Sequence, residues 1–542
     1  MSWRRLIALG CALWASLAAA FDIPAGDTPV VLDVTTTTIG AWHWNNLNST
    51  SCDDNYGEGL ERLTATATRG PWTLGVRLDG SLYGPVPQVR LATATTPGCN
   101  QVDLRSRFLP TVIPERIWGS YTDRTFEVTL GDSYVSFGRG LALSLRKNDE
   151  LSTDTALRGA RVGLRTDRVS AHLVGGVTNI GNIDEASGRF TVDPMDVVLG
   201  AQADTKVVEG MRVGVHAVGY AFHAPLSTPP MGVDTAWKER WLHSGFTFDA
   251  PRLTPWLGLY VEGLWQRRWP ITGEVKNGFG AYAAATLSVG AVTLLFEGKA
   301  YGDLAVLHPR FDFIEFQPVQ YSAPPTLERV LQPLEHGQRN IYGGRLRADW
   351  RVNATLGLFA AHGLFLDAEG YLDPNSLALL PGTIHDPTAG LDWTIEGFRI
   401  LGEAGWRFVY LPGNAEAVRS DGHFEVTVQK QLGTSTRSLE LHVTDWERVK
   451  VMPLSVERWR EGSAQLGFRW RPLQAYAGLD FSTEPGQPQT WYPNGTLQWD
   501  ITRSTNLRLM VGSTRGGLRC VSGVCRVFPP FSGAKLAFTA RF

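Results

Sequence analysis

The sequence predicts an all-β protein, a large antiparallel transmembrane β-barrel of about 24 strands, within a range of about 22–26. Three observations support this fold class. Segments of about ten residues alternate apolar and polar side chains along most of the chain, as the strands of a membrane barrel do. Short turns alternate with longer, more polar loops. The composition, 43% hydrophobic and 19% charged, is too polar for a bundle of membrane helices.

The N-terminal segment predicts export. Residues 1–20 have the pattern of a signal peptide, because Arg4 and Arg5 precede an apolar run and Ala18–Ala20 supply small residues for cleavage. Elsewhere, no stretch of 18 apolar residues predicts a membrane helix. Nothing in the composition divides the rest of the chain, so residues 21–542 are expected to form a single barrel domain.

The strand pattern is clearest in five segments that put apolar side chains on one face and charged or polar ones on the other. These segments are 72–79, 257–266, 345–352, 439–444 and 506–511. Residues 534–542 alternate in the same way and carry Phe542 on the apolar face. Because the last strand of a closed barrel pairs with the first, we expect this strand to pair with Val30–Trp44. Its polar residues, from Lys535 to Arg541, then face the lumen.

The connections between the predicted strands sort by length. Eleven short turns fall near Gly70-Pro71, Asp123-Arg124, Asp167-Arg168, Glu209-Gly210, Pro251-Arg252, Gly290, Val352-Asn353, Glu396-Gly397, Gly433, Arg471-Pro472 and Arg503-Ser504. Twelve longer loops alternate with them, near 45–57, 84–114, 131–156, 180–194, 224–235, 268–276, 303–338, 370–386, 412–420, 447–453, 485–490 and 516–529. Short periplasmic turns opposite long extracellular loops are typical of outer-membrane barrels, and a soluble sandwich has no reason to sort its loops in this way.

Tryptophans near the predicted strand ends favour the same fold, because aromatic girdles flank the apolar band of a membrane barrel. A buried core position is the alternative for any one of them. The tryptophans in question are Trp42, Trp44, Trp118, Trp241, Trp256, Trp406, Trp470 and Trp491.

Several stretches resemble a known family. The segments Gly131–Arg146, Arg158–Val162 and Gly516–Pro529 are similar to a functionally uncharacterised, porin-like family of bacterial outer-membrane β-barrel proteins. The final strand also resembles the closing strand of such barrels. The resemblance implies a location in the outer membrane of a Gram-negative bacterium and recognition of Phe542 by the outer-membrane assembly machinery as an assembly signal. It implies no activity, so no catalytic residue is carried over.

The exported chain has four candidate disulfide cysteines, Cys52, Cys99, Cys520 and Cys525. An oxidising compartment favours disulfides, with Cys520 and Cys525 closing a small loop and Cys52 pairing with Cys99. A metal site is the alternative, but the spacing is not that of a zinc site and histidines do not cluster nearby. We therefore expect no metal and no cofactor.

The polar faces of the strands predict a charged barrel interior. An interior of this kind is normally filled with water or braced by paired charges. The excess of arginine over acids favours small anionic solutes, while a ladder of ion pairs that selects nothing is the alternative. The candidate lumen-lining residues are Arg77, Asp79, Arg161, Arg165, Glu262, Arg345, Arg347, Asp349, Arg351, Glu440, Arg469 and Arg471.

Two loops and one hairpin are the remaining candidates for function. The loops 131–156 and 303–338 are expected either to fold into the lumen or to lie outside the barrel. In the hairpin 423–444, a turn at Gly433 places Glu425 opposite His442, and such a pair can act as a general base. Polar pairs line every barrel interior, however, and the motifs of known hydrolases are absent. The sequence therefore does not predict an enzyme.

The function that follows is that of a porin-like channel or solute-binding transport barrel that performs no chemistry. The alternative is a structural or interaction barrel whose long extracellular loops bind a partner or a surface polymer. The expected partners are the lipid bilayer and the assembly machinery. A net charge of −2 gives no basic excess, which argues against binding of nucleic acid.

Overall fold

The structure is a computed structural model of the chain. It describes residues 21–23, 28–45, 47, 54–84, 110–148, 150–178, 181–183, 190–192, 195–222, 239–270, 273–306, 320–327, 339–433, 436–521 and 524–542. Within these ranges, no helix is long and apolar enough to cross a membrane.

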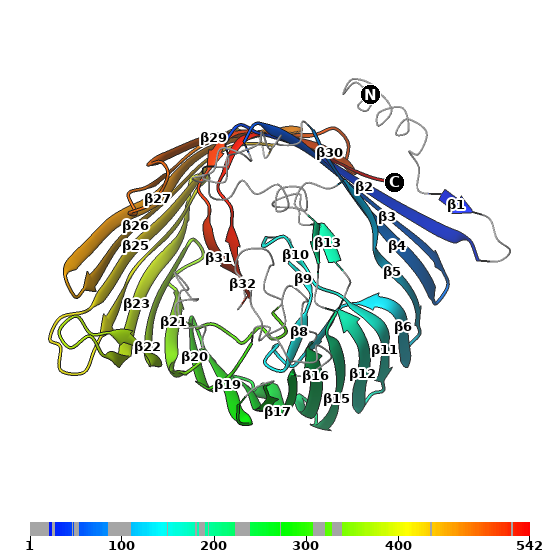
Figure 1. The fold of residues 1–542 in the computed structure, drawn as a ribbon, viewed down its shortest axis with the longest axis horizontal. Coiled ribbons are helices and arrows are strands. Elements are labelled where there is room, and N and C mark those ends of the chain that lie inside the picture. The colour runs from blue at the N-terminus through cyan, green and yellow to red at the C-terminus, as the bar shows by residue number, and fades with distance from the viewer. Residues whose placement is uncertain are drawn as a thin grey trace.

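Twenty-four antiparallel strands form a closed ring (Figure 1). Each strand pairs with the next one along the wall, and the ring closes where β2 pairs with β33, with Thr37 opposite Thr539. The predicted strand number and the predicted closing pair are therefore confirmed. The strands of the wall are β2 (Val30–His43), β3 (Tyr56–Arg69), β4 (Trp72–Tyr83), β5 (Thr111–Thr122), β6 (Phe126–Ser133), β11 (Leu157–Arg165), β12 (Val169–Thr178), β15 (Val197–Val208), β16 (Met211–Phe222), β17 (Glu239–Thr254), β18 (Leu257–Trp269), β19 (Lys276–Val289), β20 (Val292–Gly302), β21 (Ile341–Arg351), β22 (Leu356–Leu372), β23 (Leu379–Ile395), β24 (Phe398–Tyr410), β25 (Arg419–Gln431), β26 (Arg437–Met452), β27 (Ser455–Trp470), β28 (Leu473–Ser482), β29 (Trp491–Asp500), β30 (Thr505–Thr514) and β33 (Phe531–Arg541).

The remaining strands are short. β1 (Phe21–Ile23) pairs with the start of β2. Four two-stranded hairpins lie in the connections of the wall, and β8, β9, β10, β13, β31 and β32 lie inside the ring in Figure 1. These hairpins are β7 (Val135–Phe137) with β8 (Leu143–Leu145), β9 (Lys147–Asn148) with β10 (Thr153–Asp154), β13 (Gly181–Ile183) with β14 (Phe190–Val192), and β31 (Gly517–Val521) with β32 (Val524–Phe528).

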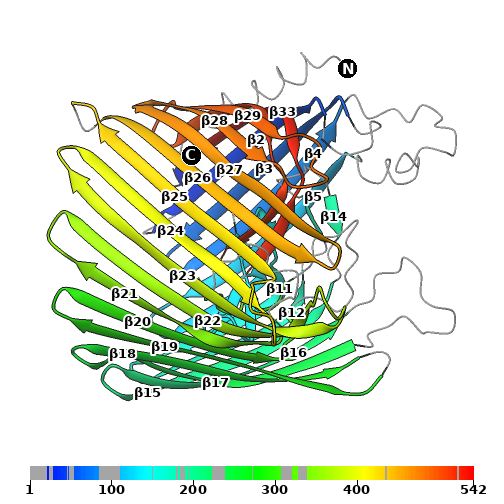
Figure 2. The same cartoon turned by 90° about the vertical axis from the view of Figure 1, so that its left-hand side faces the viewer.

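The outer face of the wall is apolar because the alternation of each strand places one set of side chains outward. Leu74, Leu130, Leu199 and Val215 are each at least 60% exposed, although they are large hydrophobic residues. In water such a continuous apolar surface is unfavourable, whereas in a bilayer it meets hydrocarbon. Figure 2 shows the strands running obliquely along the wall, as closure of a barrel requires.

The two ends of the barrel differ as expected. At one end, eleven turns of two to five residues join the strands. The predicted turn at Pro251-Arg252 is wrong, because β17 continues through these residues with an irregular register and turns at Pro255-Trp256. At the other end, the predicted loop 447–453 is also wrong: residues 447–452 continue β26, and only Pro453 and Leu454 connect it to β27. β-Strand pairing here extends beyond the point where the charged residues suggested a loop.

The predicted girdle is correct for most of the tryptophans and wrong for Trp241. Trp42, Trp256 and Trp491 are between 38% and 57% exposed, whereas Trp241 is 2% exposed. Trp241 lies on the inward face of β17, where its ring contacts Phe222 with centroids 4.6 Å apart. A girdle residue also lies near a strand end. The difference is only that Trp241 falls on the inward-facing set of alternate residues in β17, whereas a girdle residue falls on the outward-facing set.

Candidate functional site

The interior of the barrel holds a folded segment, residues 134–156 between β6 and β11, which we call the lumen insert. Its apolar residues Phe137, Leu141 and Leu143 are at most 1% exposed. They belong to one hydrophobic cluster with inward-facing wall residues that include Val198 and Tyr220. The insert is therefore held to the wall by a hydrophobic core that lies inside the barrel.

Polar contacts fix the position of the lumen insert on β16–β19. The carbonyl oxygen of Ala142 accepts a hydrogen bond from the hydroxyl of Tyr220 and lies 2.9 Å from Nδ1 of His243. The backbone N–H of Arg139 donates to Glu262 at 2.8 Å. Gly138 has a positive φ of 54°, and a Cβ atom there would lie 2.5 Å from a carboxylate oxygen of Glu262. The positive φ favours glycine at this position, and a larger side chain would also have to displace the carboxylate of Glu262.

The connection between β20 and β21 also lies inside, in two of the parts that the structure describes, 303–306 and 320–327. Ser144 donates its N–H to the carbonyl of Tyr321 at 2.7 Å, and Ala323 donates to Gly140 at 2.8 Å. Tyr321 is fully buried, and its hydroxyl donates to Asp196. Phe311, Phe313 and Phe316 of this connection lie outside the described residues. For both loops whose location was left open, the described parts therefore lie in the lumen.

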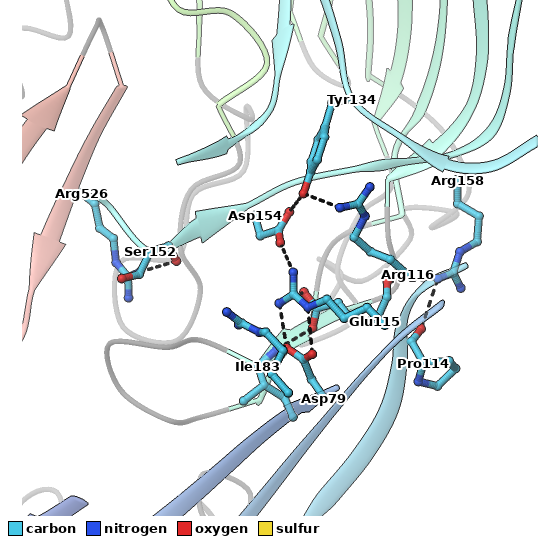
Figure 3. Close-up of polar contacts among 12 residues, drawn as sticks. Asp79, Pro114, Glu115, Arg116, Tyr134, Ser152, Asp154, Arg158, Ile183 and Arg526 are labelled. Carbon is cyan, nitrogen blue, oxygen red and sulfur yellow. Dashed lines mark hydrogen bonds and ion pairs between the residues drawn. The ribbon is translucent and has the colours of Figure 1, made fainter. Parts of the chain in front are cut away.

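On another part of the wall, an ionic cluster of Arg77, Asp79, Glu115, Tyr134 and Asp154 joins the insert to β4 and β5. Arg77 donates to both carboxylate oxygens of Asp79, at 2.9 and 2.7 Å, and forms ion pairs with Glu115 and with Asp154 of the insert. Tyr134 donates its hydroxyl to Asp154 at 2.6 Å. Figure 3 shows Tyr134 and Asp154 of the insert pointing toward Asp79 and Glu115 of the wall.

The cluster is buried, so its charges depend on one another. Arg77, Asp79 and Glu115 are at most 4% exposed. Two further arginines balance the three carboxylates: Arg62 donates to Asp79 at 3.1 Å, and Arg116 donates to Tyr134 at 3.0 Å. Burial, together with the negative charge of Asp154, raises the pKa of Tyr134, so its hydroxyl remains a hydrogen-bond donor at neutral pH.

Two other connections meet the same region. Arg526 of β32 donates to the carbonyl oxygens of Leu151 and Ser152 at 2.9 and 2.8 Å, and it is 5% exposed. The backbone N–H of Ile183 in β13 donates to Glu115 at 3.3 Å. In Figure 3, Arg526 and Ile183 approach the cluster from two different elements. The described parts of four connections therefore converge inside the barrel.

The predicted lumen-lining residues are distributed over several environments. Arg77 and Glu262 contact the lumen insert, and Arg161 donates to the carbonyl of Tyr134 at 3.2 Å. Asp79 pairs with Arg77 beside the insert. Some of the others form pairs along the wall: Arg345 with Glu297, Arg347 with Asp349, and Glu440 with Gln429. The rest are exposed and lie near the short turns, namely Arg165, Arg351, Arg469 and Arg471. Arg471 is in a turn and not on a strand.

A pocket of about 530 Å³ lies against β20–β25 toward the short-turn end of the wall. The side chain of Arg347 lies over the ring of Phe359, 4.0 Å from its centroid, and pairs with Asp349 at 2.7 Å. The side chains of this pair are 34% and 43% exposed. Unlike the ionic cluster, this part of the inner wall is accessible to water.

The predicted pairing of Glu425 with His442 is wrong. The turn between β25 and β26 spans five residues, so the register differs by two from the predicted one and His442 lies opposite Thr427. Nδ1 of His442 is 2.9 Å from the hydroxyl of Thr427, and Glu425 lies opposite Thr444. The hairpin therefore does not bring the predicted base and carboxylate together.

The cysteine predictions remain predictions. Cys52 and Cys99 lie outside the described residues, whereas the backbone register places Cys520 directly opposite Cys525 in the hairpin of β31 and β32. Among the residues that the structure describes, no three His, Cys, Asp or Glu side chains are grouped so that they can hold a metal ion.

Sequence reasoning missed Tyr134, Glu115, Asp154 and Arg526. Glu115 sits on a strand whose irregular register with β4 obscures the alternation, and the other three lie in or contact connections. The run of aromatic, glycine and leucine residues in 131–146 was the available signal, because a solvent-exposed loop has little reason to carry so many apolar side chains.

The closed wall, its apolar exterior and its polar, partly filled interior define an outer-membrane β-barrel protein. Residues 478–542 match a family of unknown function (DUF6029), which covers the last strands of the wall. A search of curated proteins found no match.

Solved outer-membrane proteins have a similar shape. The siderophore receptor PirA from Pseudomonas aeruginosa is 9% identical, with a TM-score of 0.47, over 94% of this chain and 80% of the receptor. The FrpB iron transporter from Neisseria meningitidis is 10% identical, with a TM-score of 0.44, over 94% and 82%. The translocation pore of the P pilus usher PapC is 9% identical, with a TM-score of 0.43, over 94% and 99%.

Proposed function

We propose that the protein is a porin-like transport barrel of the outer membrane, in which the lumen insert narrows the interior and solutes pass without chemistry. One observation carries this proposal. The inner wall along β21–β24 keeps charged side chains accessible to water beside a pocket near the short turns, while the insert covers the inner wall at β15–β19 and contacts β4. A pair such as Arg399 with Asp392, with side chains 51% and 47% exposed, indicates a wetted surface rather than a sealed core.

The charge preference of the proposed passage has two opposing contributions. The predicted set of lumen residues contains more arginines than acids, which favours small anions. The pocket itself has the opposite balance, which favours cations. Its charged lining consists of Arg347, Arg351, Asp349, Asp392, Glu403 and Glu425. A reversal potential across a KCl gradient decides between these two contributions.

The test is conductance. Purified protein in a planar lipid bilayer should show discrete current steps. Replacing Arg347→Gln removes a cation from the pocket, so the reversal potential should move toward cation preference. The control Arg267→Gln, on the outward face of β18, should leave it unchanged. A silent wild-type barrel, or equal shifts in both variants, contradicts the proposal.

The alternative function is a structural or interaction barrel. It predicts no current steps in a planar bilayer and a partner that binds the long extracellular loops. The described parts of four connections are folded inward, which leaves less of each loop available to an external partner. This observation favours transport over the alternative. The assembly machinery, the solutes and any surface partner remain predictions.

A further inference from the structure

A second site lies on the outside of the barrel. The outward faces of β25–β29 enclose a groove of about 730 Å³, which we call the outer groove. Phe424, Val443, Ala464, Leu479 and Trp491 contribute to its lining. Phe424 and Trp491 are 40% and 57% exposed, so the groove is open to whatever surrounds the barrel.

Charged residues border one end of the outer groove. Arg460 pairs with Asp445 at 2.7 Å, and Arg458 pairs with Glu447. The arginine side chains are 60% and 69% exposed, against 14% and 43% for their carboxylate partners. Each pair is neutral as a whole, but the guanidinium groups are the more exposed members of both pairs, so they are the charged groups most accessible to a ligand at the border of the groove.

The position of these pairs along the wall matches the edge of a bilayer. On β27 the outward residues run from Trp470, next to a short turn, to Arg460. Ten residues at about 3.3 Å each, tilted by about 40°, rise about 25 Å, which is the height of the apolar band of an outer-membrane barrel. The apolar part of the groove therefore faces the acyl chains, and its arginines lie at the level of the head groups on the extracellular side.

We infer that the outer groove binds an acylated membrane lipid with a phosphate group, its acyl chains on the apolar lining and its phosphate on Arg458 and Arg460. Guanidinium groups bind phosphate through paired donors. In the described contacts, the hydrogen bonds to the carboxylates use Nε and Nη2 of Arg458 and Nη2 of Arg460. The other N–H groups of both side chains are the donors that the phosphate oxygens of such a lipid would accept from.

The experiment uses full-length purified protein in a non-ionic detergent, with bound lipid counted by native mass spectrometry. The probes are dipalmitoyl phosphatidic acid and dipalmitoylglycerol, which differ only in the phosphate. We expect the wild type to bind the phosphate lipid at least about tenfold more tightly than the neutral one. The double variant Arg458→Gln, Arg460→Gln should lose about tenfold of that affinity, in line with the loss of charge-assisted hydrogen bonds.

Two further variants make the test specific. Ala464→Trp fills the apolar lining while it keeps both arginines, and it should weaken binding of both lipids. Arg267→Gln removes an exposed arginine near the same end of the wall, on β18, and should change neither. Equal binding of the two lipids, unchanged binding in the double variant, or an equal loss in the control overturns the inference. If the double variant does not fold, as judged by its gel mobility before and after boiling, Arg458→Gln alone takes its place. The inference is also overturned if a second protein, and no lipid, is bound to the purified wild type and is absent from the double variant.

Discussion

Replacing Asp154→Asn should loosen one half of the lumen insert and leave the other half in place. Asp154 forms the ion pair that joins the insert to Arg77, whereas Arg77 retains Asp79 on its own strand, with bonds of 2.9 and 2.7 Å. Asn has nearly the same shape, so the main change is the loss of the charge. The residues around Phe137 are held by the hydrophobic core and do not depend on this pair.

The magnitude follows from the contact that is lost. A hydrogen bond to a charged group contributes about 1.5–3 kcal/mol, and every 1.4 kcal/mol changes an equilibrium about tenfold. Amide exchange that requires local opening of residues 147–156 should therefore accelerate by about tenfold to about 140-fold. Exchange in residues 135–145 should change less than about twofold, because the hydrophobic contacts of that part remain.

Hydrogen–deuterium exchange with mass spectrometry on the purified, folded barrel measures this difference. Peptides from β26 and β27 serve as internal controls, since these strands lie away from the cluster. If exchange in 147–156 is unchanged, the ion pair does not hold the insert. If both halves of the insert accelerate together, the insert opens as one unit and the division into a hydrophobic and an ionic half is wrong.

Three other predictions follow from the same structure. Phe137→Ala should cost about 3–5 kcal/mol of local stability and accelerate amide exchange in 135–145. It should also raise the unit conductance in planar bilayers. The control Phe424→Ala, on the outer face, should leave the conductance unchanged. Burial alone would raise the pKa of Asp303, but hydrogen bonds from Arg339 and Arg268 hold the pKa below its usual value. The stabilising contribution of Asp303 is therefore complete above about pH 5 and is lost as the pH falls through about 4 and below. Amide exchange in 303–306 should accelerate only in acid. The variant Asp303→Asn should remove this pH dependence. Deleting Phe542 removes two backbone hydrogen bonds to Val34, of 2.8 and 3.0 Å, along with the predicted assembly signal; the fraction of protein that migrates as a folded band before boiling should fall, and normal assembly would contradict the prediction.

The wall was predictable because its rules are local. Alternation in 72–79 placed Arg77 and Asp79 inside and Leu74 outside, and the final strand identified its partner. The errors are local as well. A turn of five residues instead of a shorter one moved His442 away from Glu425, since register is fixed by the turn length.

The interior was less predictable because its contacts join segments that are distant in sequence. Asp154 meets Arg77 across 77 residues, and Arg526 meets Ser152 across 374. No periodicity encodes such a meeting, and neither Asp154 nor Tyr134 differs by residue type from an ordinary loop residue. The apolar run 141–145 indicated that the loop buries apolar surface. The residues that cover it come from many strands and connections, from Val174 on β12 to Val409 on β24.

The closing pair of β2 and β33 has a consequence for how the barrel forms. Nearly every other pairing in the wall joins neighbours in sequence, so the wall can grow hairpin by hairpin at little entropic cost. The last pairing brings together hydroxyls such as those of Thr37 and Thr539, which are 502 residues apart. For a free chain, closing a loop of that length costs about 5–6 kcal/mol from its length alone. In a wall that is already paired, most of that cost is spread over the preceding hairpins. Until both strands meet, however, the assembling protein carries two unpaired edges, and an unpaired edge cannot remain in hydrocarbon. Closure is thus the step at which an edge-binding helper would have the greatest effect on the yield of folded protein.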